Sequence, residues 1–180
     1  MGKLDRNFYA RPTLTVARDM LGKYLHFHGK IGRIVETEAY LGPEDLASHA
    51  RFGPKGRSRI MFGPAGYSYV YLTYGMYHML NIIAEGEGVP GGVLIRAIEP
   101  IEGIEGATNG PGRLTRSLGI TLIDNGTDLT VSPTFYLEDR GDKIMQIVEA
   151  KRVGIDYAGE YRDKPWRFFI KDNSFVSKKI

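Results

Sequence analysis

Cysteine is absent from the 180 residues of this chain. The protein therefore has no disulfide, no thiolate ligand for zinc or an iron–sulfur cluster, and no cysteine nucleophile. Histidine is scarce, with four residues, and His26 and His28 alternate along one expected strand without an evident third ligand. We therefore expect no metal site, and no motif in the sequence indicates a cofactor.

Long apolar runs are also missing. No stretch approaches the roughly 20 apolar residues that a membrane helix needs. The first residues, MGKLDRNFYARP, lack the apolar segment of a signal peptide. The sequence therefore predicts a cytoplasmic protein that has no contact with a membrane.

Acidic residues are missing from residues 51–84, although Asp and Glu together number 21 in the whole chain. This stretch carries Arg51, Lys55, Arg57 and Arg59, together with five of the 11 tyrosines. Cations hold phosphates and aromatic rings stack on bases, so one interpretation is a nucleic-acid groove. The other interpretation is a solvated basic loop beside a tyrosine-rich strand of the core.

The 23 glycines and nine prolines are scattered along the chain and predict many short elements joined by tight turns. We expect strands over residues 23–28, 31–40, 69–73, 76–83, 92–100, 129–131, 135–138, 144–150 and 166–170. We expect helices over residues 12–21, from residues 43–45 onward, and after the run Asn109–Gly112. Residues 1–180 thus form a single domain of the α+β class, with mostly antiparallel strands and a few short helices.

The segment Glu36–Tyr40 places two carboxylates and a phenol on one strand face, because alternate residues of a strand point the same way. Its neighbours Ile34 and Val35 are apolar, so Glu36 and Glu38 are expected to be partly buried. Buried carboxylates are costly unless they are paired or used, and such sites often hold a general base. A structural ion pair with Arg33 or Arg96 would explain the same pattern.

The turn of the expected hairpin over residues 69–83 is aromatic and uncharged, with the sequence Tyr74-Gly75-Met76-Tyr77. Hairpin tips are normally polar because they face water. An apolar tip is typical of a wedge that enters a base stack, or of a turn that is buried against another element. In the second strand Asn81 lies among apolar residues, so it needs a hydrogen-bond partner if it is buried.

Five blocks of the sequence closely resemble the alkyladenine (3-methyladenine) DNA glycosylase family. The blocks are GRIVETEAYLGPEDLASH, YSYVYLTYGMYHMLNI, GVLIRAIEP, NGPGRL and VGIDYAGEYRDKPWRFFI. They occur in order between about residue 8 and residue 177, which is nearly the whole chain. The resemblance implies a compact domain around a curved antiparallel sheet with a protruding hairpin.

The resemblance also implies a monofunctional enzyme of base-excision repair. Such an enzyme flips alkylated or deaminated purines out of duplex DNA and hydrolyses the N-glycosidic bond, which leaves an abasic site. Its partner is double-stranded DNA that contains damaged purines. We expect a monomer, associated with the nucleoid in a prokaryote or placed in the nucleus of a eukaryote, and no lyase activity.

Individual residues match the family's functional positions. Glu38 matches the general base that activates water, and Arg96 with the backbone of Val153 matches the groups that hold this water. The base pocket is matched by Tyr40, His49, Tyr71 and Asn81, with Asn81 placed to clash with the amino group of guanine. The residue that fills the gap in the duplex is matched by Tyr74, with Met76 and Tyr77 beside it in the minor groove.

Two other classes of function remain open on the sequence alone. The chain could be a catalytically silent binder of distorted duplex DNA, or a small glycoside hydrolase that uses Glu36 and Glu38. Binding alone does not require the pair of Glu38 and Arg96. Two carboxylates on one strand face cannot flank a sugar bond from opposite sides.

Overall fold

The structure is a computed structural model that describes residues 2–144 and 146–179. Its strands are β1 (Gly2–Lys3), β2 (Tyr24–Phe27), β3 (Lys30–Tyr40), β4 (Ser68–Thr73), β5 (Tyr77–Ile83), β6 (Gly92–Glu102), β7 (Phe135–Asp139), β8 (Ile147–Ala150) and β9 (Arg167–Ile170). Its α-helices are α1 (Arg6–Tyr9), α2 (Thr13–Asp19) and α3 (Pro111–Leu118). Four 3-10 helices are η1 (His49–Phe52), η2 (Gly56–Phe62), η3 (Leu122–Asp124) and η4 (Gly159–Asp163).

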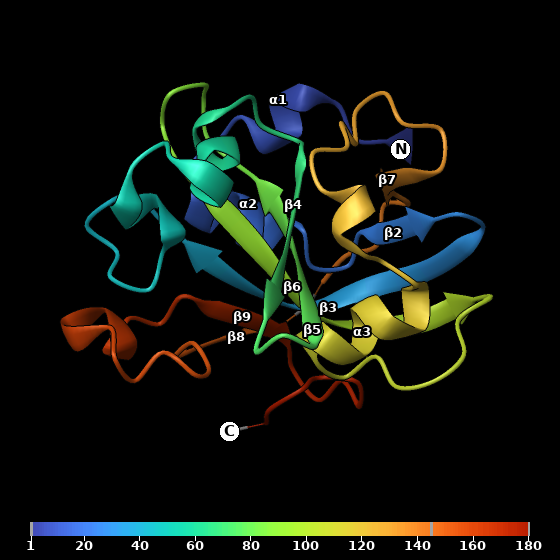
Figure 1. Ribbon diagram of the computed structural model, residues 1–180. Coiled ribbons are helices and arrows are strands. Elements are labelled where there is room, and N and C mark those ends of the chain that lie inside the picture. Colours follow the sequence, from blue (N-terminus) through green and yellow to red (C-terminus); the bar gives the residue numbers. More distant parts are fainter. Residues whose placement is uncertain (1, 145, 180) are drawn as a thin grey trace.

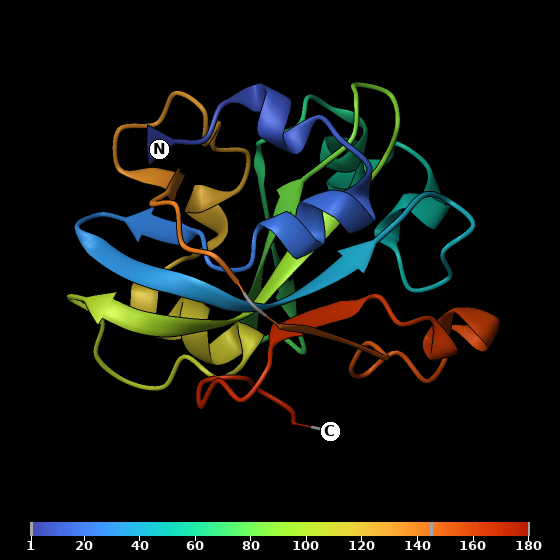
Figure 2. The same ribbon diagram turned by 180° about the vertical axis from the view of Figure 1, so that it is seen from behind.

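The strands form one antiparallel sheet in the order β1-β7-β2-β3-β6-β5-β4, and β9 adds to β3 and β8. The sheet curls, with α2 on one side and α3 on the other (Figures 1 and 2). This architecture confirms the α+β class. Within the described residues, no helix has the length and apolar character needed to cross a membrane.

The long strand β3 organises the sheet. Its first residues pair with β2, and Glu36–Glu38 then pair with β9, while β6 follows the opposite edge. Thr37 and Ala39 face α2, because the Thr37 hydroxyl donates to the carbonyl oxygen of Ala17 at 2.7 Å and Ala39 lies in the main core. Glu36 and Glu38 therefore point to the other face, as the alternation of the strand predicts.

Three register shifts interrupt the pairing of β3 with β6, and two of them are bulges on either side of Glu36. Ile34 pairs with Ile98, Glu36 with Ala97, and Thr37 with Ile95. Val35 is thus the extra residue of β3, and Arg96 is the extra residue of β6. A bulge redirects a side chain locally and is frequent beside functional sites, so these bulges control where Arg96 points.

Most of the predicted elements are present. The helix over residues 12–21 is confirmed in shorter form as α2, and the helix after Asn109–Gly112 is confirmed as α3. The hairpin is confirmed as β4 and β5, with its turn at Tyr74–Met76. The strand over 144–150 is confirmed from Ile147 onward, whereas Met145 lies outside the described residues.

Two predicted elements are wrong. Residues 43–45 form a turn instead of a helix, because Asp45 accepts hydrogen bonds from the backbone N–H groups of Leu41 and Ala47. These bonds use the carboxylate to close the loop. Residues 129–131 are also a turn, tied back by the hydrogen bonds of Asp128, and not a strand.

Substitution of Gly32 tests the close approach of β3 and β6. A Cβ atom at Gly32 would lie 2.5 Å from Cδ1 of the buried Ile98. Gly32→Ala should therefore lower the free energy of unfolding by about 1–3 kcal/mol in a urea titration. Gly86→Ala is the matched control, because its Cβ would meet nothing within 4 Å; it should be neutral or stabilise by up to about 1 kcal/mol. Equal losses in the two variants would contradict this packing.

Candidate active site

Four buried charges gather on the face of the sheet opposite α2. They are Glu36, Glu38, Arg96 and Arg167, with exposed fractions of 0%, 0%, 7% and 3%. Arg96 Nε and Arg167 Nη1 each lie 3.0 Å from Glu36 Oε1, and Arg96 Nη1 lies 3.3 Å from Glu38 Oε1. Two anions and two cations balance, which is the condition under which buried charges are tolerated.

The sequence left Arg33 and Arg96 open as partners of the two carboxylates. Arg96 is the correct one. Arg33 instead pairs with Glu99 at 3.3 Å and with Asp142 at 3.2 Å. Burial alone would lower the pKa of Arg96, but the carboxylates of Glu38 and Glu36 outweigh burial and the net pKa shift is upward. Arg96 is therefore a permanent cation beside Glu38.

Glu38 is held by donors on both of its oxygens. The backbone N–H of Val153 donates to Oε1 at 2.7 Å, on the oxygen that also faces Arg96. The Tyr40 hydroxyl donates to Oε2 at 2.8 Å. The structure thus brings together Glu38, Arg96 and Val153, the three residues that the resemblance assigned to the reaction.

A second buried ion pair supports this arrangement. Both Nη atoms of Arg152 bind the Asp45 carboxylate, at 2.7 and 2.8 Å, and the guanidinium lies over the ring of Tyr40 at 4.8 Å. Arg152 directly precedes Val153, so the pair fixes the backbone that donates to Glu38. The same pair holds the loop over residues 41–48 in place.

The pocket residues reach one face of the sheet through its strand pairing. Glu38 pairs with Leu94, Leu94 with Asn81, and Asn81 with Tyr69, across β3, β6, β5 and β4. Directly opposed residues point to the same face. Asn81 is buried, and its amide donates to the carbonyl oxygen of Tyr69 at 3.2 Å, which meets the hydrogen-bonding requirement expected from sequence.

An aromatic pocket lies beside Glu38. It is lined by Tyr40, Ala47, His49, Met61, Tyr69, Tyr71 and Asn81. The His49 and Tyr71 rings lie 4.7 Å apart between centroids, and a 2.8 Å hydrogen bond joins His49 Nδ1 to the Tyr69 hydroxyl. The free volume is about 20 Å³, which is room for about one water molecule. All four predicted pocket residues therefore line the same small cavity.

The pocket is electrically neutral near pH 7. Burial, with the nearby cations Arg57 and Arg51, lowers the pKa of His49 from 6.5 to about 4. Burial raises the pKa of Tyr69 to about 12 and raises the pKa of Tyr71 further. Burial and the Glu38 charge raise the pKa of Tyr40 well above its usual value. The pocket thus presents a neutral imidazole and protonated phenols.

The hairpin tip is exposed, so the alternative of a buried turn is wrong. Tyr74, Met76 and Tyr77 have exposed fractions of 86%, 61% and 37%. Tyr74 also has a φ of +50°, which is costly for a residue with a Cβ atom. Helix α3 supports the hairpin close to its turn, where Thr115 donates to the His78 carbonyl oxygen at 2.9 Å. Packing within the protein does not explain why Tyr74 is exposed at a strained φ on a hairpin that is fixed to α3.

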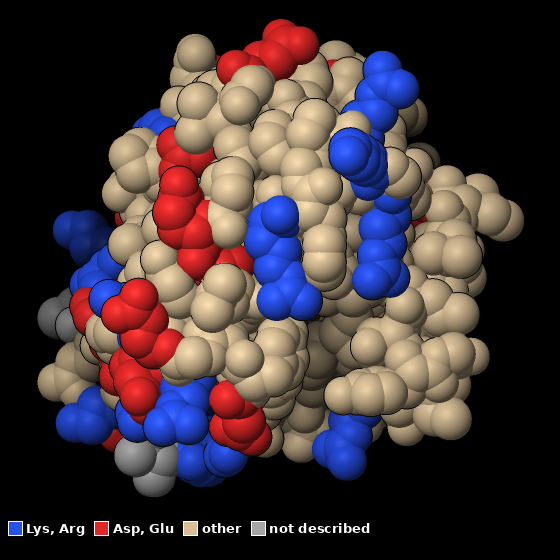
Figure 3. All heavy atoms as spheres, turned by 60° about the vertical axis from the view of Figure 1, so that its left-hand side comes forward, with Lys and Arg blue, Asp and Glu red and all other residues tan. Residues whose placement is uncertain are grey.

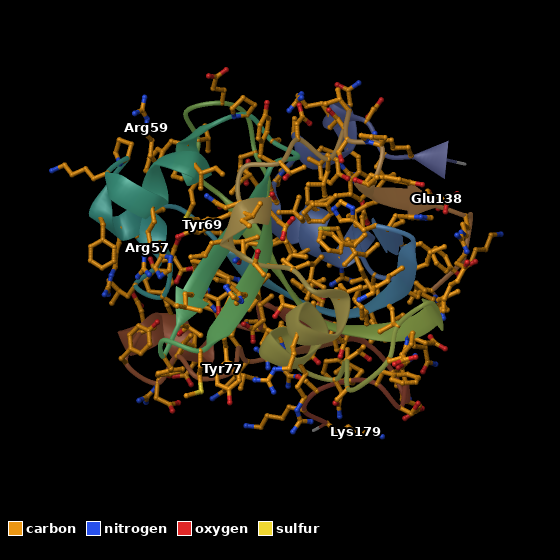
Figure 4. The ribbon with its side chains drawn as sticks, turned by 45° about the vertical axis from the view of Figure 1, so that its right-hand side comes forward. Arg57, Arg59, Tyr69, Tyr77, Glu138 and Lys179 are labelled. Atoms are coloured by element: carbon orange, nitrogen blue, oxygen red, sulfur yellow. The ribbon has the colours of Figure 1, made fainter. Side chains whose placement is uncertain are left out.

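Four cations were expected to bind the phosphates of a nucleic acid, and all four are exposed on η1, on η2 or between them: Arg51, Lys55, Arg57 and Arg59. This basic stretch thus contains two 3-10 helices. Figure 3 brings the left side of Figure 1 forward and shows Lys and Arg side chains near a hollow in this face. Figure 4 shows Arg57 on the side of η2 nearer Tyr69, with Arg59 pointing outward. The Arg57 guanidinium lies 5.6 Å from the centre of the Tyr71 ring, so the cationic surface borders the pocket.

Sequence reasoning missed several residues of the site. Tyr69 alternates with Tyr71 on β4, and this spacing could have placed it in the pocket. Met61, Arg152 and Arg167 come from distant segments and carry no local signal. No group of three His, Asp or Glu side chains within residues 2–144 and 146–179 is arranged to hold a metal ion.

The fold and site define an α+β protein with a buried carboxylate–arginine pair beside an aromatic pocket. A family model for methylpurine-DNA glycosylase matches residues 7–174. The chain is 54% identical to a protein of Anaeromyxobacter sp. (strain Fw109-5), over 98% of this chain and 93% of that protein. It is 50% identical to a protein of Legionella pneumophila (strain Lens), over 99% and 100% of the two chains, and both relatives carry the name "Putative 3-methyladenine DNA glycosylase". The chain therefore belongs to the methylpurine-DNA glycosylase family.

Titration of the His49 ring by NMR tests the electrostatics of the pocket. The midpoint should lie at about 4 instead of 6.5. Because the folded pKa is lowered, the unfolded chain takes up a proton below pH 6.5 that the folded protein does not. The free energy of unfolding should therefore fall as the pH drops from 6.5 toward 4.

A charge variant gives this titration its control. Arg57→Gln removes a nearby cation and should raise the midpoint of His49. Arg59→Gln, on the same 3-10 helix, should leave the midpoint unchanged. A wild-type midpoint near 6.5, or equal shifts in both variants, would contradict the arrangement of these charges.

Proposed function

We propose that this protein is a monofunctional DNA glycosylase that removes alkylated or deaminated purines from duplex DNA. It hydrolyses the N-glycosidic bond with a water molecule activated by Glu38 and leaves an abasic site. The observation that carries the proposal is the fully buried Glu38 carboxylate, held by Val153, Arg96 and Tyr40 at the edge of an aromatic pocket. Binding of distorted DNA without catalysis would not require this arrangement.

The proposed reaction needs few groups. A glycosidic bond breaks through an oxocarbenium-like transition state, so one carboxylate and one water can act at the sugar. Water adds to C1′, the bond between C1′ and the base nitrogen breaks with its electron pair going to the base, and Glu38 takes the proton from water. An alkylated purine is electron-poor and is already a good leaving group. Arg96 and the Val153 N–H hold the Glu38 carboxylate and the attacking water in a fixed position relative to each other.

Base selection follows from a neutral aromatic pocket. Rings accept a flipped purine by stacking, which contributes roughly 1–3 kcal/mol per base and tolerates many shapes. Asn81 lines this pocket, and its side-chain amide donates to the carbonyl oxygen of Tyr69. In this proposal Asn81 excludes normal guanine by a clash with the exocyclic amino group.

The pocket volume of about 20 Å³ requires that side chains move before a purine enters. Unstacking a base costs a few kcal/mol and is cheapest for damaged or mispaired bases. Tyr74, at the exposed tip, would occupy the gap in the duplex, with Met76 and Tyr77 in the minor groove. The cations Arg51, Lys55, Arg57 and Arg59 would hold the phosphates.

An abasic-site assay tests the proposal directly. Duplexes that contain hypoxanthine or 1,N6-ethenoadenine are incubated with the protein and then treated with or without alkali. Strand breaks that appear only after alkali indicate a monofunctional glycosylase. Breaks without alkali would indicate lyase activity, and no breaks on a panel of alkylated and deaminated purines would leave a silent DNA binder.

Glu38→Gln separates catalysis from binding. The amide has the shape of the carboxylate, and the Tyr40 hydroxyl can turn to accept from it. Arg96 keeps Glu36 as an anionic partner, so the fold should persist. Because an amide cannot take the proton from water, excision should fall by about 10²–10⁴-fold while lesion binding is retained. Glu138→Gln is the matched control, since Glu138 is a paired carboxylate of β7 outside the site. Excision at the wild-type rate by Glu38→Gln would remove Glu38 from the mechanism.

Tyr74→Ala tests the wedge. If the phenol fills the stack only after the base has left, its loss should lower the flipped population and not the rate of bond cleavage. Single-turnover excision at saturating enzyme should therefore fall more on a fully paired lesion than on the same lesion in a mismatch. Ile123→Ala, which removes another exposed apolar side chain, should have no effect on either duplex. Equal losses on both duplexes with Tyr74→Ala would contradict the role of Tyr74 as a wedge.

A further inference from the structure

The end of the chain lies against the buried charges of the site. The backbone N–H of Ser177 donates to Glu36 Oε2 at 2.6 Å, and the Ser177 hydroxyl accepts from Arg96 Nη2 at 3.1 Å. The carbonyl oxygen of Lys178 accepts from Arg167 Nη1 at 2.8 Å. A segment 141 residues away from Glu36 thus contacts three of the four charged side chains.

This segment is docked by apolar packing as well. Val176 is buried in a small cluster with Ala150 and Phe169, which belong to β8 and β9. Asn173 adds a hydrogen bond from its amide to Glu99 of β6, at 3.3 Å. Ser177 is therefore held at a defined position on the sheet, and its hydroxyl reaches Arg96 because of that docking.

The guanidinium of Arg96 is held on three sides. Its Nε atom binds Glu36, its Nη1 atom faces Glu38, and its Nη2 atom donates to Ser177. The guanidinium group is planar and rigid, so the contacts at Nε and Nη2 determine where Nη1 points. Arg96 cannot turn away from Glu38 while Glu36 and Ser177 hold the other two corners.

We propose that Ser177, together with Glu36, is a positioning residue for the hydrolysis. The C-terminal segment holds Arg96 Nη1 against Glu38 and so keeps the carboxylate in line with the attacking water. This inference rests on the proposed function. Ser177 does not touch the reacting atoms; it acts through Arg96.

Substitution of one hydroxyl isolates this contact. Ser177→Ala removes the acceptor for Arg96 and keeps the backbone N–H that binds Glu36. Ser177→Thr keeps the hydroxyl and is the conservative variant. Ser174→Ala is the matched control, because Ser174 is exposed in the same segment. Three quantities are measured for each variant. They are the rate of single-turnover excision from an ethenoadenine duplex, the affinity for a duplex with a tetrahydrofuran abasic analogue, and the thermal midpoint of unfolding.

Ser177→Ala should lower the single-turnover rate about tenfold, the scale of one hydrogen bond to a charged group. Its affinity for the abasic analogue and its thermal midpoint should stay near the wild-type values. Ser177→Thr should restore the rate to within about twofold of the wild type, and Ser174→Ala should match the wild type.

Three outcomes would overturn the inference. The rate of Ser177→Ala could equal that of the wild type; the threonine variant could lose as much as the alanine variant; or weaker DNA binding could account for the whole loss. If the wild-type protein releases no base, the proposed function fails instead, and this is seen before any variant is compared.

Discussion

The balance of four charges inside the sheet is the constraint on which the site depends. Glu36 and Glu38 are fully buried, and each would be costly in an apolar interior without a cation. Arg96 contacts both of them, and Arg167 contacts Glu36. Glu36 therefore has a structural role that leaves Glu38 free to interact with Tyr40 and Val153. A buried pair of this kind orients the residues around it, and removal of one member leaves a buried charge without compensation.

The backbone geometry explains why these charges meet at one point. The bulge between Glu36 and Thr37 makes Arg96 the extra residue of β6, opposite this step of β3. The strand row from Glu38 through Asn81 to Tyr69 then carries the same face of the sheet into the aromatic pocket. The carboxylate and the pocket are thus parts of one surface of one sheet, and α2 closes the opposite face.

The side chains that would contact DNA are exposed, in contrast to the buried charges of the site. The hairpin tip exposes Tyr74 at a positive φ, and the cations of η1 and η2 face solvent around the pocket. An exposed apolar tip and a group of exposed cations are both typical of a surface that binds a partner. The chain's membership of the methylpurine-DNA glycosylase family agrees with a nucleic-acid partner.

The sequence by itself determined the elements whose signals are local. Glycine at Gly75 and alternating residues on either side were enough to predict the hairpin and its turn, and strand alternation placed Glu36, Glu38 and Tyr40 on one face. The resemblance supplied Arg96 and Val153, whose roles no spacing could indicate. Only the tertiary structure decided the rest. Asp45 was predicted to begin a helix, but its partner Arg152 lies 107 residues away, and pairing with a buried arginine outweighs a helix-terminus preference of less than about 1 kcal/mol. Likewise Ser177 reaches Arg96 across 81 residues of sequence. Such contacts depend on how strands pair across the sheet, and pairing between distant segments leaves no periodic pattern in the chain.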